Sequence, residues 1–196
     1  MPTEFEAKFL GVDPKAFAAL MQAHGGTLTH PRRLMRRVVF HQHEATARVP
    51  GIYWRVRDEG NGLITMTFKN IHNENAIDGV HEVELKVDDF EAGLAFLKTA
   101  GLVQAAYQET WRTNWTFQET DIALDEWPGL RPFIEIEGPD ESAVMRAATA
   151  LGFDMSTAVF GAVDQVYTRE MNLSADVINH LPLISFDHPP IRKISA

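Results

Sequence analysis

The sequence contains no cysteine, which excludes disulfide bonds, thiolate metal sites and a cysteine nucleophile. It also lacks an apolar run of roughly 20 residues, as a membrane span needs, and its first residues lack the apolar core of a signal peptide. Positive charge is scarce, because 18 Lys and Arg stand against 27 Asp and Glu, for a formal net charge of −9. A general binder of nucleic acid or membrane surfaces needs an electropositive footprint, so neither partner is expected. These absences predict a soluble cytoplasmic protein that meets any anionic ligand with a local basic site.

Three segments share one plan, in which a Glu-x-Glu pair in an alternating stretch precedes a helix-like stretch that ends at glycine. The copies begin at Glu4, Glu82 and Glu135. Each predicted helix has an aspartate that can cap its start and a glycine that can end it. These pairs are Asp13 and Gly25, Asp88 or Asp89 and Gly101, and Asp140 and Gly152. With 196 residues, 45% of them hydrophobic, the chain is long enough to bury one substantial core.

Further strands are predicted between these copies from alternation and from β-branched and aromatic content. They cover roughly residues 35–41, 52–58, 63–70, 108–117 and 121–126. The turn from Asp58 to Leu63, which contains Gly60 and Gly62, joins two of them as a hairpin. The predicted fold class is α+β, with a mostly antiparallel sheet and a few helices.

Each predicted strand has an apolar and a charged face, because alternate side chains of a strand point to opposite sides. In the first strand, Glu4, Glu6 and Lys8 share the charged face. The other charged faces carry Arg55 and Arg57, Lys69, Glu82 and Glu84, Arg112, and Glu135 and Glu137. When helices cover the apolar faces and the sheet closes on itself, the charged faces line the lumen of a barrel.

A lumen lined by both carboxylates and cations calls for a ligand, because buried charges are costly unless they are paired or coordinate ions. Carboxylate pairs suit a hard cation such as Mg²⁺ or Mn²⁺. Lysine and arginine rows suit phosphate oxygens, which arginine can bind through two parallel hydrogen bonds. A complex of a metal with a polyphosphate satisfies both rows.

The stretch Glu4-Phe5-Glu6-Ala7-Lys8 resembles the N-terminal Glu-x-Glu-x-Lys of the CYTH family, also called triphosphate tunnel metalloenzymes. A lone copy of this pattern is weak, but later motifs resemble those of the family in the same order. They are Trp54-Arg55-Val56-Arg57, Thr67-Phe68-Lys69, His81-Glu82-Val83-Glu84, Arg112, Leu124-Asp125 and Phe133-Ile134-Glu135-Ile136-Glu137-Gly138. The resemblance covers roughly residues 3–170.

The resemblance implies an eight-stranded antiparallel β-barrel with a charged lumen, a tunnel covered by several helices. We expect this domain to span residues 1–172 and to be followed by a tail, residues 173–196, of unknown role. The resemblance further implies that Mg²⁺ or Mn²⁺ binds to Glu4, Glu6, Glu135 and Glu137. It places phosphate contacts on Lys8, Arg55, Arg57, Lys69 and Arg112. Glu82 and Glu84 would orient these cations or assist a second metal, and the catalytic set would be Glu4, Glu6, Lys8 and Glu135.

The function expected first is metal-dependent hydrolysis of inorganic triphosphate, a nucleoside triphosphate or thiamine triphosphate. The rival is a class IV adenylyl cyclase, which the stretch FIEIEGPDESAV also resembles. A third hypothesis is a non-catalytic polyphosphate-binding module, because Thr110 stands where relatives often carry a lysine. The expected partner is a triphosphate-containing small molecule. The oligomeric state is not predicted, and the protein is either a monomer or a homodimer formed through the tail.

Several other motifs have a structural interpretation that we prefer to a functional one. The basic run Arg32, Arg33, Arg36 and Arg37 is interpreted as a solvated face, except that Arg37 is expected to face inward and bind substrate. His41 and His43 are interpreted as structural, since no second ligand cluster accompanies them. Trp111, Trp115 and Trp127 are expected to pack on the outer face of the barrel.

Overall fold

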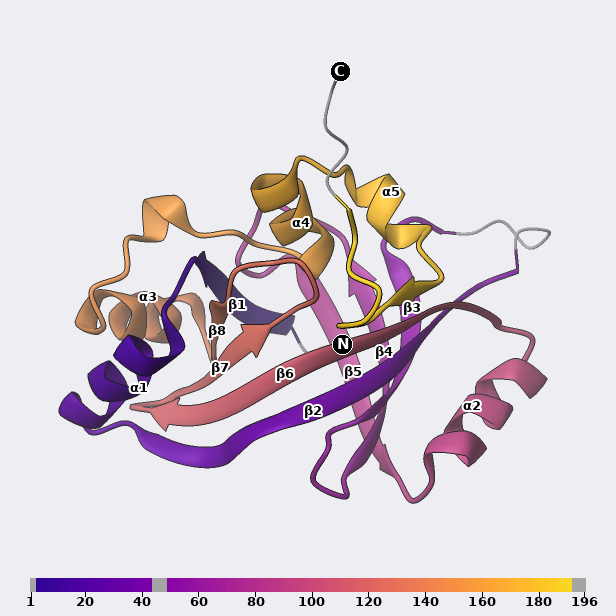
Figure 1. The fold of residues 1–196 in the computed structure, drawn as a ribbon, viewed down its shortest axis with the longest axis horizontal. Helices are drawn as coiled ribbons and strands as arrows, with labels where there is room; N and C mark the ends of the chain where they lie inside the picture. Colours follow the sequence, from indigo (N-terminus) through magenta and orange to yellow (C-terminus); the bar gives the residue numbers. More distant parts are fainter. Residues whose placement is uncertain (1–2, 44–48, 192–196) are drawn as a thin grey trace.

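The computed structural model describes residues 3–43 and 49–191 and shows a closed antiparallel barrel with helices on its outside (Figure 1). The strands are β1 Thr3–Leu10, β2 Thr27–His41, β3 Ile52–Asp58, β4 Ile64–Ile71, β5 Val80–Val87, β6 Val103–Phe117, β7 Thr120–Glu126, β8 Phe133–Gly138 and β9 Leu183–Ile184. The helices are α1 Pro14–Ala23, α2 Phe90–Thr99, α3 Glu141–Ala150, the short 3-10 helix η2 Met155–Thr157, α4 Val163–Met171 and α5 Ala175–Asn179.

The sheet closes because its two longest strands pair with each other. Its order is β2-β3-β4-β5-β1-β8-β7-β6, and the additional pairing of β2 with β6 completes the ring. β9 adds to β6 as a short parallel strand outside the eight. The expected α+β fold with an eight-stranded antiparallel barrel is thereby confirmed.

The strands β2 and β6 begin earlier than the sequence patterns predict. β2 starts at residue 27, not near 35, and β6 starts at residue 103, not near 108. The first half of β2 is exposed, and its pairing with β6 shifts register between Leu28 and His30 and again between His30 and Arg33. Irregular, exposed pairing interrupts the alternation that marks a half-buried strand, so the predicted starts were wrong.

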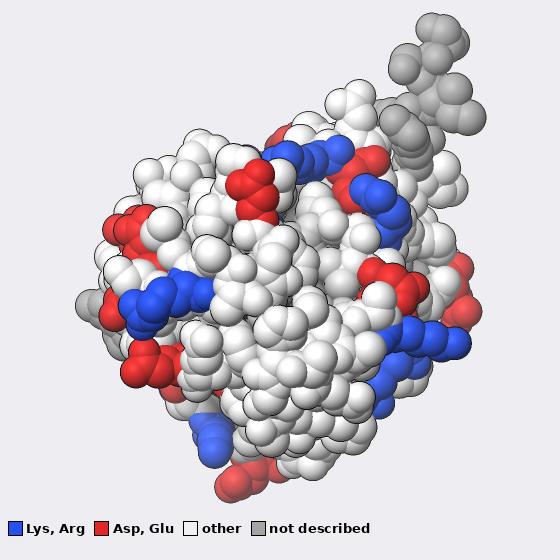
Figure 2. Space-filling model, turned by 90° about the vertical axis from the view of Figure 1, so that its left-hand side faces the viewer, with Lys and Arg blue, Asp and Glu red and all other residues white. Residues whose placement is uncertain are grey.

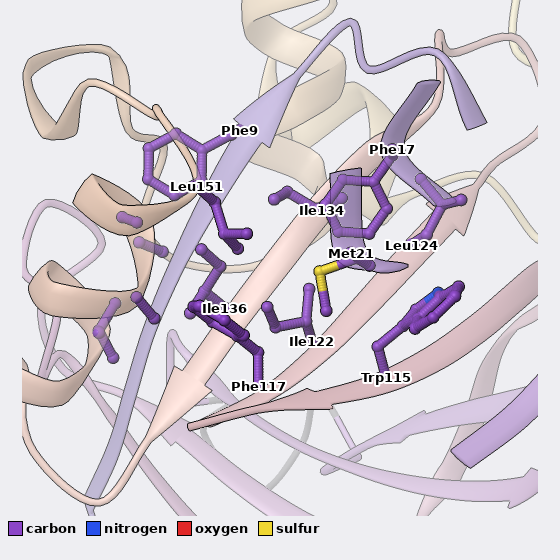
Figure 3. Close-up of a cluster of buried hydrophobic side chains, with 14 residues drawn as sticks. Phe9, Phe17, Met21, Trp115, Phe117, Ile122, Leu124, Ile134, Ile136 and Leu151 are labelled. Carbon is purple, nitrogen blue, oxygen red and sulfur yellow. The ribbon is translucent and has the colours of Figure 1, made fainter. Parts of the chain in front are cut away.

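The apolar strand faces pack outward against the helices, as expected. In Figure 3, Phe17 and Met21 of α1 point toward Ile122 and Ile134 on the outer face of the barrel. α3 covers the same side, while α2 packs on β3 around Val56. The lumen is therefore left to the charged faces.

The predicted helix ends are confirmed by their caps. The side chains of Asp13, Asp89 and Asp140 each accept a hydrogen bond from a backbone N–H in the first turn of α1, α2 and α3. Gly25, Gly101 and Gly152 follow the three helices with φ of 79°, 88° and 80°. Glycine adopts this left-handed conformation without the steric cost of a Cβ.

The described part of the C-terminal tail packs against the barrel. Leu173, Ile178 and Ile184 lie in one buried cluster with Trp127 and Tyr167. In Figure 1, α4 and α5 lie side by side over the barrel. Residues 192–196 of the predicted tail lie outside the described residues, and the division at residue 172 stays a prediction.

The outer surface has no extended region of one charge on the face that Figure 2 shows. Blue and red side chains are interspersed there around a largely uncharged centre. Within the described ranges, no helix is long and apolar enough to cross a membrane.

Candidate functional site

One cavity of about 330 Å³ runs into the barrel and contains all the side chains that the sequence predicted for the site. They are Glu4, Glu6, Lys8, Arg37, Arg55, Arg57, Lys69, Glu82, Glu84, Arg112, Glu135 and Glu137. Strand register brings them together: Arg55 lies opposite Thr67, which lies opposite Glu84, and Lys8 lies opposite Glu135. The predicted convergence of residues that are distant in sequence is therefore observed, and their chemical roles remain predictions.

Lys8 lies among the carboxylates of β1 and β8. It is only 1% exposed, and its Nζ donates to the Gly161 carbonyl at 2.6 Å and to the Glu6 carboxylate. The same Nζ lies 3.6 Å from Glu135. Burial disfavours its charge, but Glu6 and Glu135 outweigh burial and raise the pKa of Lys8. Lys8 thus holds two of the predicted metal ligands in place.

Lys69 binds two more carboxylates on the other side of the lumen. Its Nζ lies 2.8 Å from Glu4 and 2.5 Å from Glu82. Burial raises the pKa of Glu4 to about 8 against the effect of Lys69, and neighbouring Glu82 and Glu6 raise it further. Burial also opposes the charge of Glu82, but Lys69 and Arg55 lower its pKa to about 2. At neutral pH this group contains one firmly ionised carboxylate and one that readily holds a proton.

Two of the arginines in the lumen, Arg55 and Arg112, are bound to acidic side chains. Arg55 donates to Thr67 Oγ1 at 3.1 Å and to Glu84 at 3.4 Å. Arg112 forms two hydrogen bonds to Asp125, of 2.6 and 2.5 Å, and a third to Glu135 at 2.7 Å. Such paired, parallel hydrogen bonds orient a guanidinium strongly.

Arg57 has a partner that the sequence patterns missed, namely Glu59, to which its Nε donates. Glu59 is 6% exposed, and it also accepts from Thr65 Oγ1 at 3.3 Å and lies 3.8 Å from Arg33. Glu59 follows Arg57 by two positions, so the alternation of β3 continues into the hairpin turn. Extending that alternation by one step would have found it.

Trp127 corrects a prediction. It was expected on the outer face, but it lines the cavity, and the guanidinium of Arg37 lies over its ring at 4.2 Å from the centroid. It follows inward-facing Asp125 by two positions, which is the signal that could have placed it. Trp115 packs in the outer core and Trp111 stacks with Arg32, as expected of outer-face residues.

The remaining predictions for single residues mostly hold. Arg32 and Arg36 are exposed and pair with Glu126 and Asp58, as expected of a solvated face. Arg33 differs, because its Nε donates to the backbone carbonyl of Glu59 at 2.7 Å. Thr110 is 3% exposed, its hydroxyl donates to the Glu126 carbonyl at 3.1 Å, and it is not among the residues that line the cavity, so it does not take the place of a phosphate-binding lysine.

The carboxylates of β1 and β8 fit a divalent cation by their chemistry, not by preformed geometry. Within residues 3–43 and 49–191, no group of three or more His, Asp or Glu side chains is arranged to hold a metal ion. Glu4, Glu6 and Glu135 instead face Lys69, Lys8 and Arg112. Burial, followed by the charge of Glu6, raises the pKa of Glu137 to about 7. Crowded carboxylates of this kind would be stabilised by a hard cation once their side chains turn toward it.

Comparison with known proteins agrees with this geometry. A family model described as CYTH domain matches residues 3–158. No sequence among the curated proteins matches the chain. Among solved structures, a presumed adenylate cyclase from Vibrio parahaemolyticus has a TM-score of 0.69 at 15% identity, with coverage of 85% of this chain and 98% of that one.

Two further structures share the fold. A conserved hypothetical protein from Pyrococcus furiosus has a TM-score of 0.66 at 19% identity, over 80% of this chain and 94% of that one. The Hippeastrum protein HpAC1, a presumed adenylyl cyclase described as having a dominant triphosphatase activity, has a TM-score of 0.55 at 17% identity. That match covers 85% of this chain and 95% of HpAC1. At such identities the likeness establishes the fold alone.

Proposed function

The chain belongs to the CYTH domain family, and on this premise we propose that it is a divalent-metal-dependent hydrolase of a triphosphate. The proposed substrates are inorganic triphosphate, a nucleoside triphosphate and thiamine triphosphate. The observation that carries the proposal is one cavity lined by both cations and carboxylates, which are paired with each other. Phosphoryl transfer relies mainly on positioning and on stabilising charge, and both rows serve that purpose.

The chain's own residues have distinct roles in this proposal. Arg55, Arg57, Lys69 and Arg112 bind the phosphate oxygens, and Glu82 and Glu84 keep Arg55 and Lys69 oriented until substrate arrives. Glu4, Glu6, Glu135 and Glu137 would hold Mg²⁺ or Mn²⁺, with Lys8 positioning Glu6 and Glu135. A bound divalent cation supplies Lewis-acid stabilisation of phosphate oxygens. The barrel wall limits access of bulk water, which strengthens each of these interactions.

A class IV adenylyl cyclase is the second candidate. The stretch from Phe133 to Val144 resembles those enzymes, and the same cavity could position ATP for attack of its ribose hydroxyl on the α-phosphorus. The two functions differ in their products. Cyclisation releases cyclic AMP and pyrophosphate, whereas hydrolysis releases free phosphate.

The deciding experiment incubates the purified protein with ATP, tripolyphosphate or thiamine triphosphate, each with Mg²⁺ or Mn²⁺. Phosphate without cyclic AMP supports the hydrolase, and cyclic AMP with pyrophosphate supports the cyclase. Binding of tripolyphosphate without any product supports the third hypothesis, a polyphosphate-binding module. Absence of both product and binding contradicts all three.

The variant Glu135→Gln tests the proposed metal site. It removes a carboxylate charge from the cavity, so we expect turnover to fall by about 10²-fold or more while tripolyphosphate binding persists. Glu141→Gln, on the exposed surface of α3, is the matched control and should leave turnover unchanged. Undiminished turnover in Glu135→Gln would contradict the assigned site.

A further inference from the structure

Among the residues that the structure describes, Arg37 differs from the other cations of the cavity in having no carboxylate within ion-pair distance. Five of them lie within 4.0 Å of a carboxylate oxygen, namely Lys8, Arg55, Arg57, Lys69 and Arg112. In the part of the chain that the structure describes, no carboxylate oxygen lies within that distance of Arg37. Its charge is therefore not neutralised by direct contact.

Two uncharged side chains hold the Arg37 guanidinium in place. Its Nε donates to Gln108 Oε1 at 2.8 Å, from the position opposite it on β6. Its central carbon Cζ lies over the Trp127 ring, and Trp127 is itself held by an edge-on contact with Tyr167. Gln108 and Trp127 therefore orient the guanidinium without cancelling its charge.

The surroundings of Arg37 make its charge costly. Burial, followed by the nearby charges of Arg55, Arg57 and Arg112, lowers the pKa of Arg37 to about 9, which still leaves it charged at neutral pH. Tyr53, Asp125 and Glu135 act on it from a distance, and Asp125 and Glu135 already bind Arg112. A partly buried cation next to other cations is stabilised when an anion arrives.

We propose that Arg37 is an open anion subsite of the tunnel, and that Gln108 and Trp127 are the residues that position it. The subsite binds an oxygen of the substrate's phosphate chain, and in this respect the inference rests on the proposed function. The subsite depends on the side chain at position 108 being a neutral amide. A glutamate at position 108 would preserve the size of the side chain and the hydrogen bond, but it would neutralise Arg37.

The test is the variant Gln108→Glu, with tripolyphosphate binding measured by calorimetry with and without Mg²⁺. We expect affinity to fall about tenfold or more, because Arg37 then has a permanent carboxylate partner. The midpoint of thermal unfolding should be unchanged or higher, which a merely structural role of Gln108 would not explain. Gln104→Glu adds the same charge at an exposed position of β6 and should change affinity less than about twofold.

Arg37→Gln is a second variant and should lose affinity to a similar extent. The subsite is wrong if either variant, Gln108→Glu or Arg37→Gln, remains folded and binds tripolyphosphate as tightly as the natural protein. In that outcome the proposed function still stands. If the natural protein itself binds no tripolyphosphate under either condition, the proposed function and the subsite are both overturned.

Discussion

Single charged residues of the tunnel have partners that a ligand can replace. Lys69 binds Glu4 and Glu82, Lys8 binds Glu6, and Arg112 binds Glu135. When a phosphate oxygen binds one of these cations, the carboxylate that the cation had bound is released. A freed carboxylate is a ligand for Mg²⁺ or Mn²⁺, so binding of the phosphate chain and of the metal should assist each other.

Glu59 allows a prediction about stability and pH. Burial raises the pKa of this carboxyl, but Arg57 and Arg112 outweigh burial and lower it below its ordinary value. A lowered pKa in the folded state means that the ionised group stabilises the fold above the pKa of the unfolded chain. Glu59→Gln should therefore reduce the free energy of unfolding by about 1–3 kcal/mol at pH 7, as chemical denaturation would measure.

That loss should shrink as the pH falls below about 4, because protonation removes the same charge from the natural protein. Glu119→Gln is the control, since Glu119 forms only an exposed pair with Arg146. A loss for Glu59→Gln that does not change with pH would show that the ionic contacts of Glu59 contribute nothing.

Residues of the cavity could be predicted from the sequence where the alternation of a strand placed charged side chains on one of its faces. Both features were present from Glu4 to Lys8 and at Arg55, Lys69 and Glu135. Gln108 and Trp127 lie on the same inward faces, but neither is charged, so composition gave no reason to select them. The proposed release of carboxylates from the cations to the metal could not be predicted from the sequence either, because it depends on distances across the lumen.

Among the elements, the hairpin between β3 and β4 shows how a turn positions charged side chains. The Glu59 carbonyl accepts from Arg33, and Gly60 packs directly on the backbone of β2. A Cβ at Gly60 would lie 2.1 Å from the Leu34 carbonyl oxygen. The turn could be predicted from its glycines, but this close approach to a third strand could not, since it depends on barrel closure.

Gly60 and Gly62 provide a matched pair for this contact. Both have positive φ, 72° and 87°, but a Cβ at Gly62 meets no atom within 4 Å. Gly62→Ala should reduce the free energy of unfolding by about 1 kcal/mol, the cost of the backbone conformation alone. Gly60→Ala should cost at least about 2 kcal/mol more, because backbone atoms must move. Equal losses in urea denaturation would contradict the close packing of the hairpin on β2.

At the scale of the whole molecule, the C-terminal tail belongs to the structure that surrounds the cavity. Ile178 and Asn179 of α5 line the cavity beside Asp164, and Asn179 donates to Asp164 at 2.8 Å. The sequence patterns did not predict this placement, because a short helix and a two-residue strand lack a detectable period. Their position depends on the cluster around Trp127 and Tyr167, which only the folded barrel creates.

Shortening a buried side chain of the tail by substitution should therefore destabilise the entire domain. Ile178→Ala removes a side chain that is 1% exposed, so we expect the free energy of unfolding to fall by about 2–5 kcal/mol. Ile191→Ala, at a position 84% exposed, should change it by less than about 0.5 kcal/mol. Similar unfolding curves for Ile178→Ala and the natural protein would mean that the tail folds apart from the barrel.

The measurement that tests the central claim most directly is the coupling between metal and triphosphate. Calorimetry would determine tripolyphosphate affinity with and without Mn²⁺, and Mn²⁺ affinity with and without tripolyphosphate, corrected for the complex that the two form in solution. We predict that each ligand strengthens binding of the other by the same factor, about tenfold or more, because phosphate binding releases the carboxylates that the metal needs. Independent binding of the two ligands, or binding of either one outside the cavity, would contradict the account.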